Sequence, residues 1–471
     1  MFSRKAALKR TLGFALVLST AFVLTTELCG CGSPQQGQAG RCEIHVAVNG
    51  NDASGNGTQD APYATVTAAA ESAPGSTIVM HAGDYGPIEL GPECSGSEEA
   101  PTIIRPAEGE DVVIRAEGEI GFSLINVSYI AVEGLEIEGG THGVYYQSTR
   151  EAEQPLTDVR ISGCTVHGVR GTHGICVYAR NDLAPVQNLT IEDCEVYDCD
   201  CGDSESMVLN GNVDGFVIKN NVIHDTNNIG IDMIGFEGTA KHPDGDSNIN
   251  VYEVDMARNG ICTGNVIYDI STEGNRAYLE DGEYDLCAGG IYVDGGQNIE
   301  ISDNFIFNCD IGLEVATEHN PDDNELFRVS GVHVHDNVIA DCLGYAGICF
   351  GGYDNDRGFT EECTFEHNTL VDNAAQIGIQ RSKDNRIFAN LVIGGDAAVE
   401  FSEDCRKEDM VNDVSGNAFC EISNEACWKA KYGSRYEDRT EVADGFRSLI
   451  DDVGSRFVPD DELMTLYTTH S

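Results

Sequence analysis

A short strand pattern recurs about every 30 residues through most of the chain. Its sixth position is occupied in succession by Leu135, Cys164, Cys194, Asn221, Asn265, Asn304, Asn337 and Asn368, which stand 27 to 44 residues apart. A period in this range, made of strands and turns without a helical stretch, is typical of a stacked β-solenoid. We expect the asparagines to form an internal ladder, in which each side-chain amide bonds to the turns above and below.

Each repeat carries a second strand of the form Gly, apolar, X, apolar, with its clearest copies at 228–235, 289–295 and 310–316. Alternation places the apolar residues on one face of the strand and the X residues on the other. If the strands stack in register, the X residues Asp232, Asp294 and Glu314 share one outward surface. The predicted first outward column is Tyr145, Cys176, Val208, Asp232, Tyr292, Glu314, Cys349, Gln380 and Glu400, and the second includes Asn210, Ile234, Asp294 and Ala316.

The two longest spacings, 44 and 39 residues, mark insertions at 235–259 and 271–287. Both flank the strands of Asp232 and Asp294 and are predicted to wall a cleft over the acidic face. Carboxylates held close together raise one another's pKa, which suits one to act as an acid and another as a base or nucleophile. The alternative is ordinary surface, since a lone outward Asp on a solenoid usually has no further role.

The first insertion contains oxygen-bearing side chains at the spacing of a calcium loop. Asp244, Asp246 and Asn248 follow the pattern D-x-D-x-N, and Asp255 stands at the twelfth position. Ile249 replaces the glycine expected at the sharp turn, so the match is partial. The sequence therefore predicts Ca²⁺ as a candidate cofactor, with a solvated acidic turn as the alternative.

The N-terminal region has the features of an export signal. A basic start is followed by an apolar run over 12–24, which is short for a membrane span, and then by Leu28-Cys29-Gly30-Cys31, which looks like a bacterial lipobox. We expect a lipoprotein signal peptide over 1–30, a flexible tether over 31–43 and an anchor on Cys31. The protein is then an exported lipoprotein of the cell envelope, at the outer membrane or cell surface; ordinary cleavage without a lipid is the alternative.

The 18 cysteines permit disulfides in an exported chain. We predict one disulfide between Cys42 and Cys94, and another within Cys405, Cys420 and Cys427. Cys164 and Cys194, in the ladder, are expected to be buried thiols. No CxxC pair has zinc-site spacing, which argues against a structural zinc site.

Charge excludes one large class of function. With 79 acidic against 28 basic residues, the formal net charge is −51, so no basic face can be assembled for nucleic acid. We expect a monomer that meets a membrane only through its N-terminal anchor.

Residues 44–85, with a strand, a turn-rich loop, an Ala-rich helix and another strand over 77–85, resemble the N-terminal cap of pectin-lyase-like right-handed parallel β-helices. The resemblance covers roughly 44–403, and implies an all-β chain: a single right-handed parallel β-helix with an N-terminal helical cap and a small capping segment at 404–471. A capping helix is expected near 441–451. Lyases of this superfamily hold Ca²⁺ with Asp residues and abstract a proton with Lys or Arg, whereas its hydrolases rely on Asp carboxylates.

The resemblance implies a surface-anchored enzyme that cleaves a polysaccharide or oligosaccharide, by hydrolysis or elimination. The acidic column holds no outward Lys or Arg, so Lys241 and Arg258 in the insertion are the basic candidates. Non-catalytic glycan binding, or a structural role in the envelope, is the alternative. The candidate catalytic residues are Asp232, Asp294, Glu314 and Arg258, and the candidate substrate contacts are Tyr292, Glu318, His319, Asn210 and Lys241.

Overall fold

The computed structural model describes residues 42–246, 248–352, 356–402 and 404–420, and the backbone of two further short strands at 426–429 and 456–457. The predicted signal peptide, the lipobox and the capping helix near 441–451 lie outside the described residues. No helix in the described part of the chain is long and apolar enough to cross a membrane.

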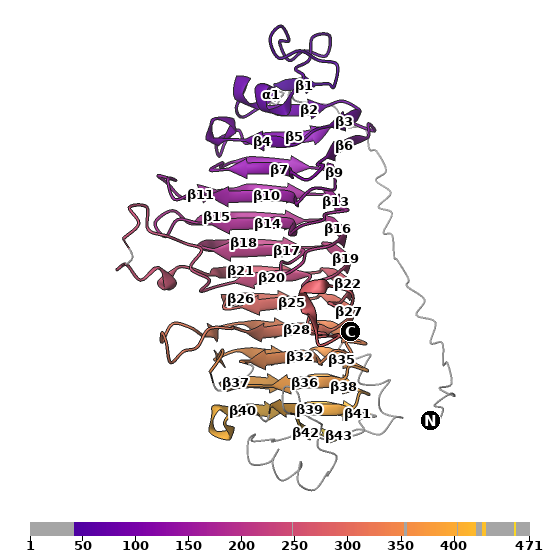
Figure 1. The fold of residues 1–471 in the computed structure, drawn as a ribbon, viewed down its shortest axis with the longest axis vertical. Helices are drawn as coiled ribbons and strands as arrows, with labels where there is room; N and C mark the ends of the chain where they lie inside the picture. The colour runs from indigo at the N-terminus through magenta and orange to yellow at the C-terminus, as the bar shows by residue number, and fades with distance from the viewer. Residues whose placement is uncertain are drawn as a thin grey trace, which may run out of the picture. The chain divides into compact units, whose positions relative to one another are not determined.

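The described chain winds into coils whose strands form three parallel sheets (Figure 1). The 16-stranded sheet contains β1 (Glu43–Val46), β2 (Thr77–Met80), β5 (Thr102–Pro106), β8 (Ile130–Glu133), β11 (Leu156–Thr157), β12 (Val159–Ser162), β15 (Val186–Glu192), β18 (Val213–Lys219), β21 (Ala257–Thr263), β26 (Gln297–Ser302), β29 (Val329–Ser330), β30 (His333–His335), β33 (Thr360–Glu361), β34 (Thr364–Glu366), β37 (Ser382–Phe388) and β40 (Met410–Ser415). The 13-stranded sheet contains β3 (Gly83–Tyr85), β6 (Val112–Arg115), β9 (Glu136–Glu138), β13 (Thr165–His167), β16 (Glu195–Cys199), β19 (Val222–Thr226), β22 (Val266–Ile270), β27 (Phe305–Cys309), β31 (Val338–Ala340), β35 (Thr369–Val371), β38 (Leu391–Ile393), β41 (Ala418–Cys420) and β43 (Arg456–Phe457).

The 12-stranded sheet carries the predicted acidic face. It contains β4 (Ile88–Leu90), β7 (Ile120–Ile125), β10 (His142–Ser148), β14 (His173–Ala179), β17 (Met207–Gly211), β20 (Ile231–Ile234), β25 (Gly289–Asp294), β28 (Ile311–Ala316), β32 (Ala346–Gly351), β36 (Ala375–Ile379), β39 (Ala397–Ser402) and β42 (Ala426–Lys429). In each regular coil the chain passes from the 16-stranded sheet to the 13-stranded and then to the 12-stranded sheet. The prediction of a right-handed parallel β-helix is confirmed.

Inward residues of successive strands stack into continuous apolar columns. In the 16-stranded sheet, for example, Ile161 pairs in register with Ile191, Ile191 with Ile218, and Ile218 with Cys262, and all four are buried. Such columns form one core along the coils, and burial of this apolar surface is the main stabilising contribution. Glycine recurs near the start of strands in the 12-stranded sheet because a larger residue would not fit there. At Gly290, for example, a Cβ would lie only 2.6 Å from Cγ2 of Ile306.

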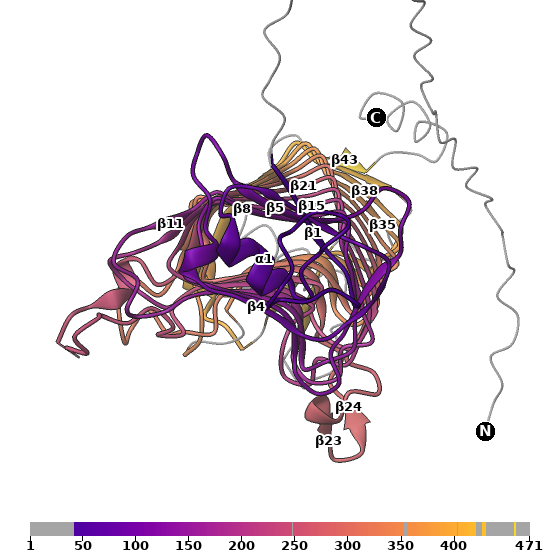
Figure 2. The same ribbon diagram turned by 90° about the horizontal axis from the view of Figure 1, so that it is seen from above.

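The N-terminal end of the β-helix is covered by a short α-helix, as predicted. The helix α1 (Val66–Ser72) begins at Thr65, whose side chain accepts the N–H of Ala68 at 3.2 Å. Ala69 and Ala70 are buried against the first strands, and Figure 2 shows α1 across the end of the coils. The strand expected over 77–85 is two strands, β2 and β3, because the chain turns from one sheet to the next between them.

The predicted asparagine ladder is present. Asn221, Asn265, Asn304 and Asn337 each donate from Nδ2 to Oδ1 of the next member, at 2.9 to 3.0 Å, and Asn368 receives the last of these bonds. The ladder extends beyond the predicted members, through Asn390 and Asn417. Each amide also donates to a backbone carbonyl of the coil before it, so the buried turns are satisfied by side chains.

Two expectations about the ends of the domain differ from the structure. Cys42 is exposed and Cys94 is buried, and both are free thiols, so the predicted Cys42–Cys94 disulfide is wrong. Cys405 and Cys420 are buried, whereas Cys427 has no described side chain, so the second predicted disulfide stays a prediction. The parallel pairing continues past position 403, because β40 pairs with β37 and β41 with β38. Cys164 and Cys194 are buried thiols, as predicted.

Candidate active site

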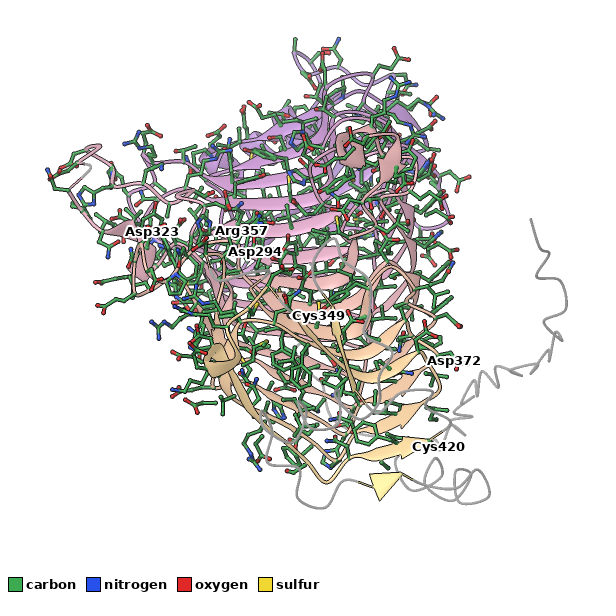
Figure 3. All side chains as sticks on the ribbon, turned by 60° about the horizontal axis from the view of Figure 1, so that its bottom comes forward. Asp294, Asp323, Cys349, Arg357, Asp372 and Cys420 are labelled. Carbon is green, nitrogen blue, oxygen red and sulfur yellow. The ribbon has the colours of Figure 1, made fainter. Side chains whose placement is uncertain are left out.

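The predicted carboxylates share the outward face of the 12-stranded sheet. Asp232 on β20 stands in register with Tyr292 on β25, Tyr292 with Glu314 on β28, and Glu314 with Cys349 on β32. Their neighbours along each strand, such as Ile231 and Met233, belong to the core, which fixes these side chains outward. Figure 3 shows Asp294 toward the edge of the coils and Cys349 in the middle of the sheet.

Although they point away from the core, the carboxyl groups are buried. Asp232 and Glu314 are each 2% exposed and Asp294 is 7% exposed. Burial raises the pKa of Asp232 well above its ordinary value, and the charges of Glu205, Asp294 and Glu314 raise it further. Burial and the charge of Glu318 raise the pKa of Glu314 to about 8. The site therefore holds protonated carboxyl groups at neutral pH.

Several buried polar atoms on this face have no hydrogen-bond partner in the described protein. They are Oδ1 of Asn210, Asn228 and Asp232, Oε1 of Glu314 and Oε1 of Gln380. A buried polar atom without a partner costs about 1–3 kcal/mol, and few occur in a native protein without a reason. Their concentration on one face indicates a surface that is completed by a polar ligand.

One rim of the face is formed by an exposed ion pair. Nε2 of His319 lies 3.1 Å from Oε1 of Glu237. The hydrogen bond from His319 lowers the pKa of Glu237, and the same contact raises the pKa of His319. The backbone N–H of Glu318 donates to Asp294 at 3.3 Å, and the charges of Glu318 and Glu237 add to burial in raising the pKa of Asp294. Ionised and protonated carboxyl groups thus lie next to one another.

The first insertion is fixed by Asp255, which is fully buried. Its two carboxylate oxygens accept the backbone N–H groups of Gly238 and Ala240, each at 2.6 Å. Phe236 and Tyr252 from the insertion pack on Phe327, from the loop after β28. This small apolar cluster holds the Glu237–His319 pair at the edge of the sheet.

The second insertion lies at the opposite edge and is fixed by Asp310. The Asp310 carboxylate accepts hydrogen bonds from Ser271, Thr272 and the N–H of Ala288. The insertion contains the short hairpin of β23 (Leu279–Glu280) and β24 (Glu283–Tyr284), which projects from a corner of the coils in Figure 2. Both insertions therefore flank the 12-stranded sheet, in agreement with their predicted placement.

The structure does not bring every predicted residue to this face. Arg258 lies on β21 of the 16-stranded sheet, where it donates to Oδ1 of Asn212 at 2.9 Å and to Asp214 at 3.2 Å. It does not reach over the carboxylates, because the chain has already turned the corner to another sheet. Lys241 is exposed on the first insertion and pairs through its backbone with Asn181. Tyr292 and Asn210 lie on the face as predicted.

The residues of the predicted calcium loop make different contacts and do not form one group. Asp244 accepts the N–H of Asp246, and Asp246 accepts the N–H and side-chain amide of Asn248, as in a run of turns. Among the described residues, two groups of three His, Cys, Asp or Glu side chains bring their possible metal-ligand atoms within 4.8 Å of one another. Neither group includes Asp244, Asp246 or Asp255. Because Asp255 serves backbone N–H groups, the calcium prediction rests on Asp244, Asp246 and Asn248.

Some residues of the site escaped the sequence analysis. Glu205 lies just before β17, and its burial together with the charge of Glu237 raises its pKa to about 7. Glu237 follows β20 within the insertion. The predicted column also contains one error: Gly378, not Gln380, stands in register between Cys349 and Glu400, because β36 begins earlier in its coil. The available signal for Glu205 and Glu237 was an acidic residue two or three positions from the end of a strand.

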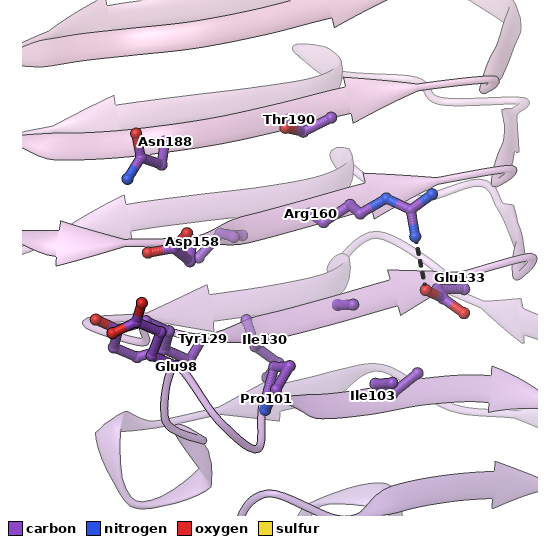
Figure 4. A pocket seen from close by; sticks show the side chains of 12 residues that line it. Glu98, Pro101, Ile103, Tyr129, Ile130, Glu133, Asp158, Arg160, Asn188 and Thr190 are labelled. Carbon is purple, nitrogen blue, oxygen red and sulfur yellow. Dashed lines mark hydrogen bonds and ion pairs between the residues drawn. The ribbon is translucent and has the colours of Figure 1, made fainter. Parts of the chain in front are cut away.

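A separate open groove of about 360 Å³ lies on the outward face of the 16-stranded sheet (Figure 4). Arg160 lies in it and pairs with Glu133 at 2.8 Å, while Tyr129 and Asp158 line the same groove. Because Arg160 is already neutralised by Glu133 and by Glu192, this groove offers no free cation to a ligand.

The three parallel sheets define a right-handed parallel β-helix with a pectin lyase-like fold. Two solved structures share this fold. The GH136 lacto-N-biosidase from Eubacterium ramulus is 14% identical, with a TM-score of 0.55, over 83% of this chain and 67% of that chain. The A-module of the mannuronan C-5 epimerase AlgE6 from Azotobacter vinelandii is 15% identical, with a TM-score of 0.50, over 84% of this chain and 94% of that chain.

At the level of sequence, the chain is 33% identical over 421 residues to the uncharacterized protein YwoF of Bacillus subtilis (strain 168), covering 82% of each protein. The chain belongs to the same family as YwoF. In addition, a family model described as periplasmic copper-binding protein (NosD) matches residues 246–434.

Proposed function

We propose that this protein is an extracytoplasmic carbohydrate-active enzyme that hydrolyses a glycan on the outward face of the 12-stranded sheet. The observation that carries the proposal is the set of buried, unpartnered oxygens that includes Oδ1 of Asp232 and Oε1 of Glu314. A bound glycan carries many hydroxyl groups, which can donate hydrogen bonds to these unpartnered oxygens. The fold, shared with a lacto-N-biosidase and a mannuronan epimerase, is compatible with this role.

The carboxyl groups divide into an acid and a base. Glu314, with a pKa of about 8, holds its proton at neutral pH and is suited to donate it to the glycosidic oxygen as the C–O bond breaks. The pKa values of Asp232 and Asp294 are raised as well, so one of these groups first releases its proton to solvent. The resulting carboxylate then takes a proton from the water that attacks the anomeric carbon. Exchange with solvent restores both groups. Because these carboxyl groups interact, their protons are bound and released by the group as a whole, and a pKa measured for the site belongs to the set rather than to one residue.

The spacing of the strands favours inversion at the anomeric carbon. Asp232 and Glu314 stand two rungs apart, so their backbones are separated by about 9.5 Å along the parallel sheet. Inverting hydrolases separate their carboxyl groups by about 6.5–9.5 Å to admit a water, whereas retaining enzymes need about 5 Å. We therefore propose an inverting mechanism.

Elimination is less well supported than hydrolysis. A lyase needs a Lys or Arg beside the carboxylates, and Arg258 is committed to Asp214 on another sheet. Calcium at Asp244, Asp246 and Asn248 remains part of the proposal as a means of ordering the first insertion beside the substrate. We further propose a location outside the cytoplasm, which the description of the matching NosD family as periplasmic supports. An anchor on Cys31 is a separate proposal that rests on the lipobox-like sequence alone.

A depolymerisation screen tests the proposal. Purified protein is incubated with a panel of neutral and acidic polysaccharides, and new reducing ends and unsaturated products are measured separately. Reducing ends without unsaturation support hydrolysis, and unsaturated products would replace it by a lyase. Glycan-array binding without any cleavage would overturn the enzymatic proposal in favour of a binding protein.

A further inference from the structure

The 12-stranded sheet carries a second group of reactive side chains on the N-terminal side of the acidic face. His142 on β10 stands in register with His173 on β14, and Cys176 lies on the same strand as His173. One ligand atom from each of the three residues lies within 4.8 Å of the others. Cys176 and Asp232 are two rungs apart in one outward column, separated by Val208.

We propose that His142, His173 and Cys176 bind a transition-metal ion that favours imidazole and thiolate ligands, namely zinc or copper. Two nitrogens and one sulfur suit these ions, whereas calcium and magnesium prefer sets of oxygen ligands. The matched segment of the NosD family model, 246–434, does not include these three residues, so the proposal rests on their geometry alone.

The surroundings orient His173 as a ligand. Its Nδ1 lies 3.0 Å from the backbone carbonyl of Glu205, and because a carbonyl only accepts, Nδ1 carries the proton. This leaves Nε2 with a free lone pair, which accepts from the hydroxyl of Tyr178 at 3.0 Å. Metal-bound histidines commonly donate their other N–H to a carbonyl or carboxylate in this way. Tyr178 is therefore placed to act as a fourth ligand or to leave when the ion binds.

His142 and Cys176 complete the arrangement. Nδ1 of His142 lies 3.1 Å from the hydroxyl of Thr141, and its ring centroid is 5.5 Å from that of His173. The thiol of Cys176 is fully buried and donates to the backbone carbonyl of Val144 at 3.7 Å. Coordination bonds of about 2.0–2.3 Å require the ligand atoms to close to roughly 3.5 Å apart. The half-buried His142 is the residue with room to move.

The chemistry of binding is a simple exchange. Before the ion arrives, the Cys176 thiol carries the proton that it donates to the carbonyl of Val144. On binding, the S–H bond breaks, the proton leaves to solvent and the sulfur lone pair forms the bond to the metal. Nε2 of His173 already accepts a hydrogen bond from Tyr178, so the imidazole binds the ion through this nitrogen without losing a proton.

Cobalt(II) titration of the full chain under reducing, anaerobic conditions tests the proposal. We expect one Co²⁺ per chain with a near-ultraviolet thiolate-to-cobalt charge-transfer band. Cys176→Ser should abolish the band, and His142→Gln should weaken binding at least tenfold. The control is Cys42→Ser, which removes an exposed thiol and should change nothing. His142 is only half-buried, so its variant reports even where Cys176→Ser fails to fold.

Competition with Zn²⁺ and with Cu⁺ then identifies the ion, and displacement by either supports the site. A band that persists in Cys176→Ser, or that disappears in Cys42→Ser, would overturn the proposal, because another thiol would be the ligand. Absence of stoichiometric Co²⁺ binding by the unmodified chain would overturn it as well. The measurement involves no glycan, so its failure is distinct from failure of the proposed hydrolysis.

Discussion

Replacing Glu314 by Gln is expected to stabilise the protein at alkaline pH and to leave its stability unchanged in acid. Between the pKa of a glutamate in the unfolded chain, near 4.5, and the value of about 8 in the fold, the folded state holds a proton that the unfolded state has released. The free energy of unfolding therefore falls as pH rises through this window. At about 1.4 kcal/mol for each pH unit, the loss approaches about 5 kcal/mol above pH 8.

Glutamine has nearly the shape of the protonated acid and does not titrate, so Glu314→Gln escapes this loss. Guanidinium denaturation at pH 5, 7 and 9 should give a difference between variant and unmodified protein that grows from near zero to several kcal/mol. The matched control is Glu325→Gln, which changes an exposed glutamate and should give a flat difference. A difference for Glu314→Gln that is flat, or that falls with pH, would refute the assignment of a buried protonated carboxyl.

Three further predictions concern the fold. Asn337→Ala should lower the free energy of unfolding by on the order of 4 kcal/mol in denaturant titrations, because the neighbouring ladder amides lose buried partners. Thr65→Ala should lower it by about 1 kcal/mol through loss of the cap of α1, and a loss above about 3 kcal/mol would contradict a simple capping role. Asp255→Ala should accelerate limited proteolysis within 236–256 while the far-ultraviolet circular dichroism stays unchanged; an unchanged cleavage rate would contradict its role as anchor.

The fold could be predicted from the sequence because every coil of a solenoid carries the same pattern of apolar and polar residues. Each coil restates the same alternation, and Asn221 to Asn368 mark its register, so the stacking of Asp232 beside Tyr292 followed from spacing alone. The predicted register was wrong at Gln380, whose expected place is taken by Gly378, because Gln376 rather than a glycine stands opposite Gly347. The disulfide between Cys42 and Cys94 was wrong because sequence position says little about which cysteine faces the core.

The site could be predicted only in part, because its remaining members lie outside the regular strands. Asp255 belongs to an insertion whose path no repeat fixes, and it accepts hydrogen bonds from the backbone of that insertion. Arg258 stands in strand β21 of another sheet, where it contacts Asp214 instead of the carboxyl groups of the site. The metal-binding group was missed for a different reason. Its histidines are 31 residues apart and meet through strand register, while the sequence analysis sought metal ligands at short spacing. The repeated Thr-His-Gly at 141–143 and 172–174 was the signal that could have revealed them.

The central claim is that the outward carboxyl groups of the 12-stranded sheet cleave the substrate. The direct measurement is kcat/KM on the polysaccharide identified by the depolymerisation screen, for the unmodified protein, Asp232→Asn, Glu314→Gln and the control Glu325→Gln. We expect both site variants to lose on the order of 10²-fold or more while remaining folded, and the control to keep full activity. Full activity in both Asp232→Asn and Glu314→Gln would contradict the claim and leave the acidic face without a catalytic role.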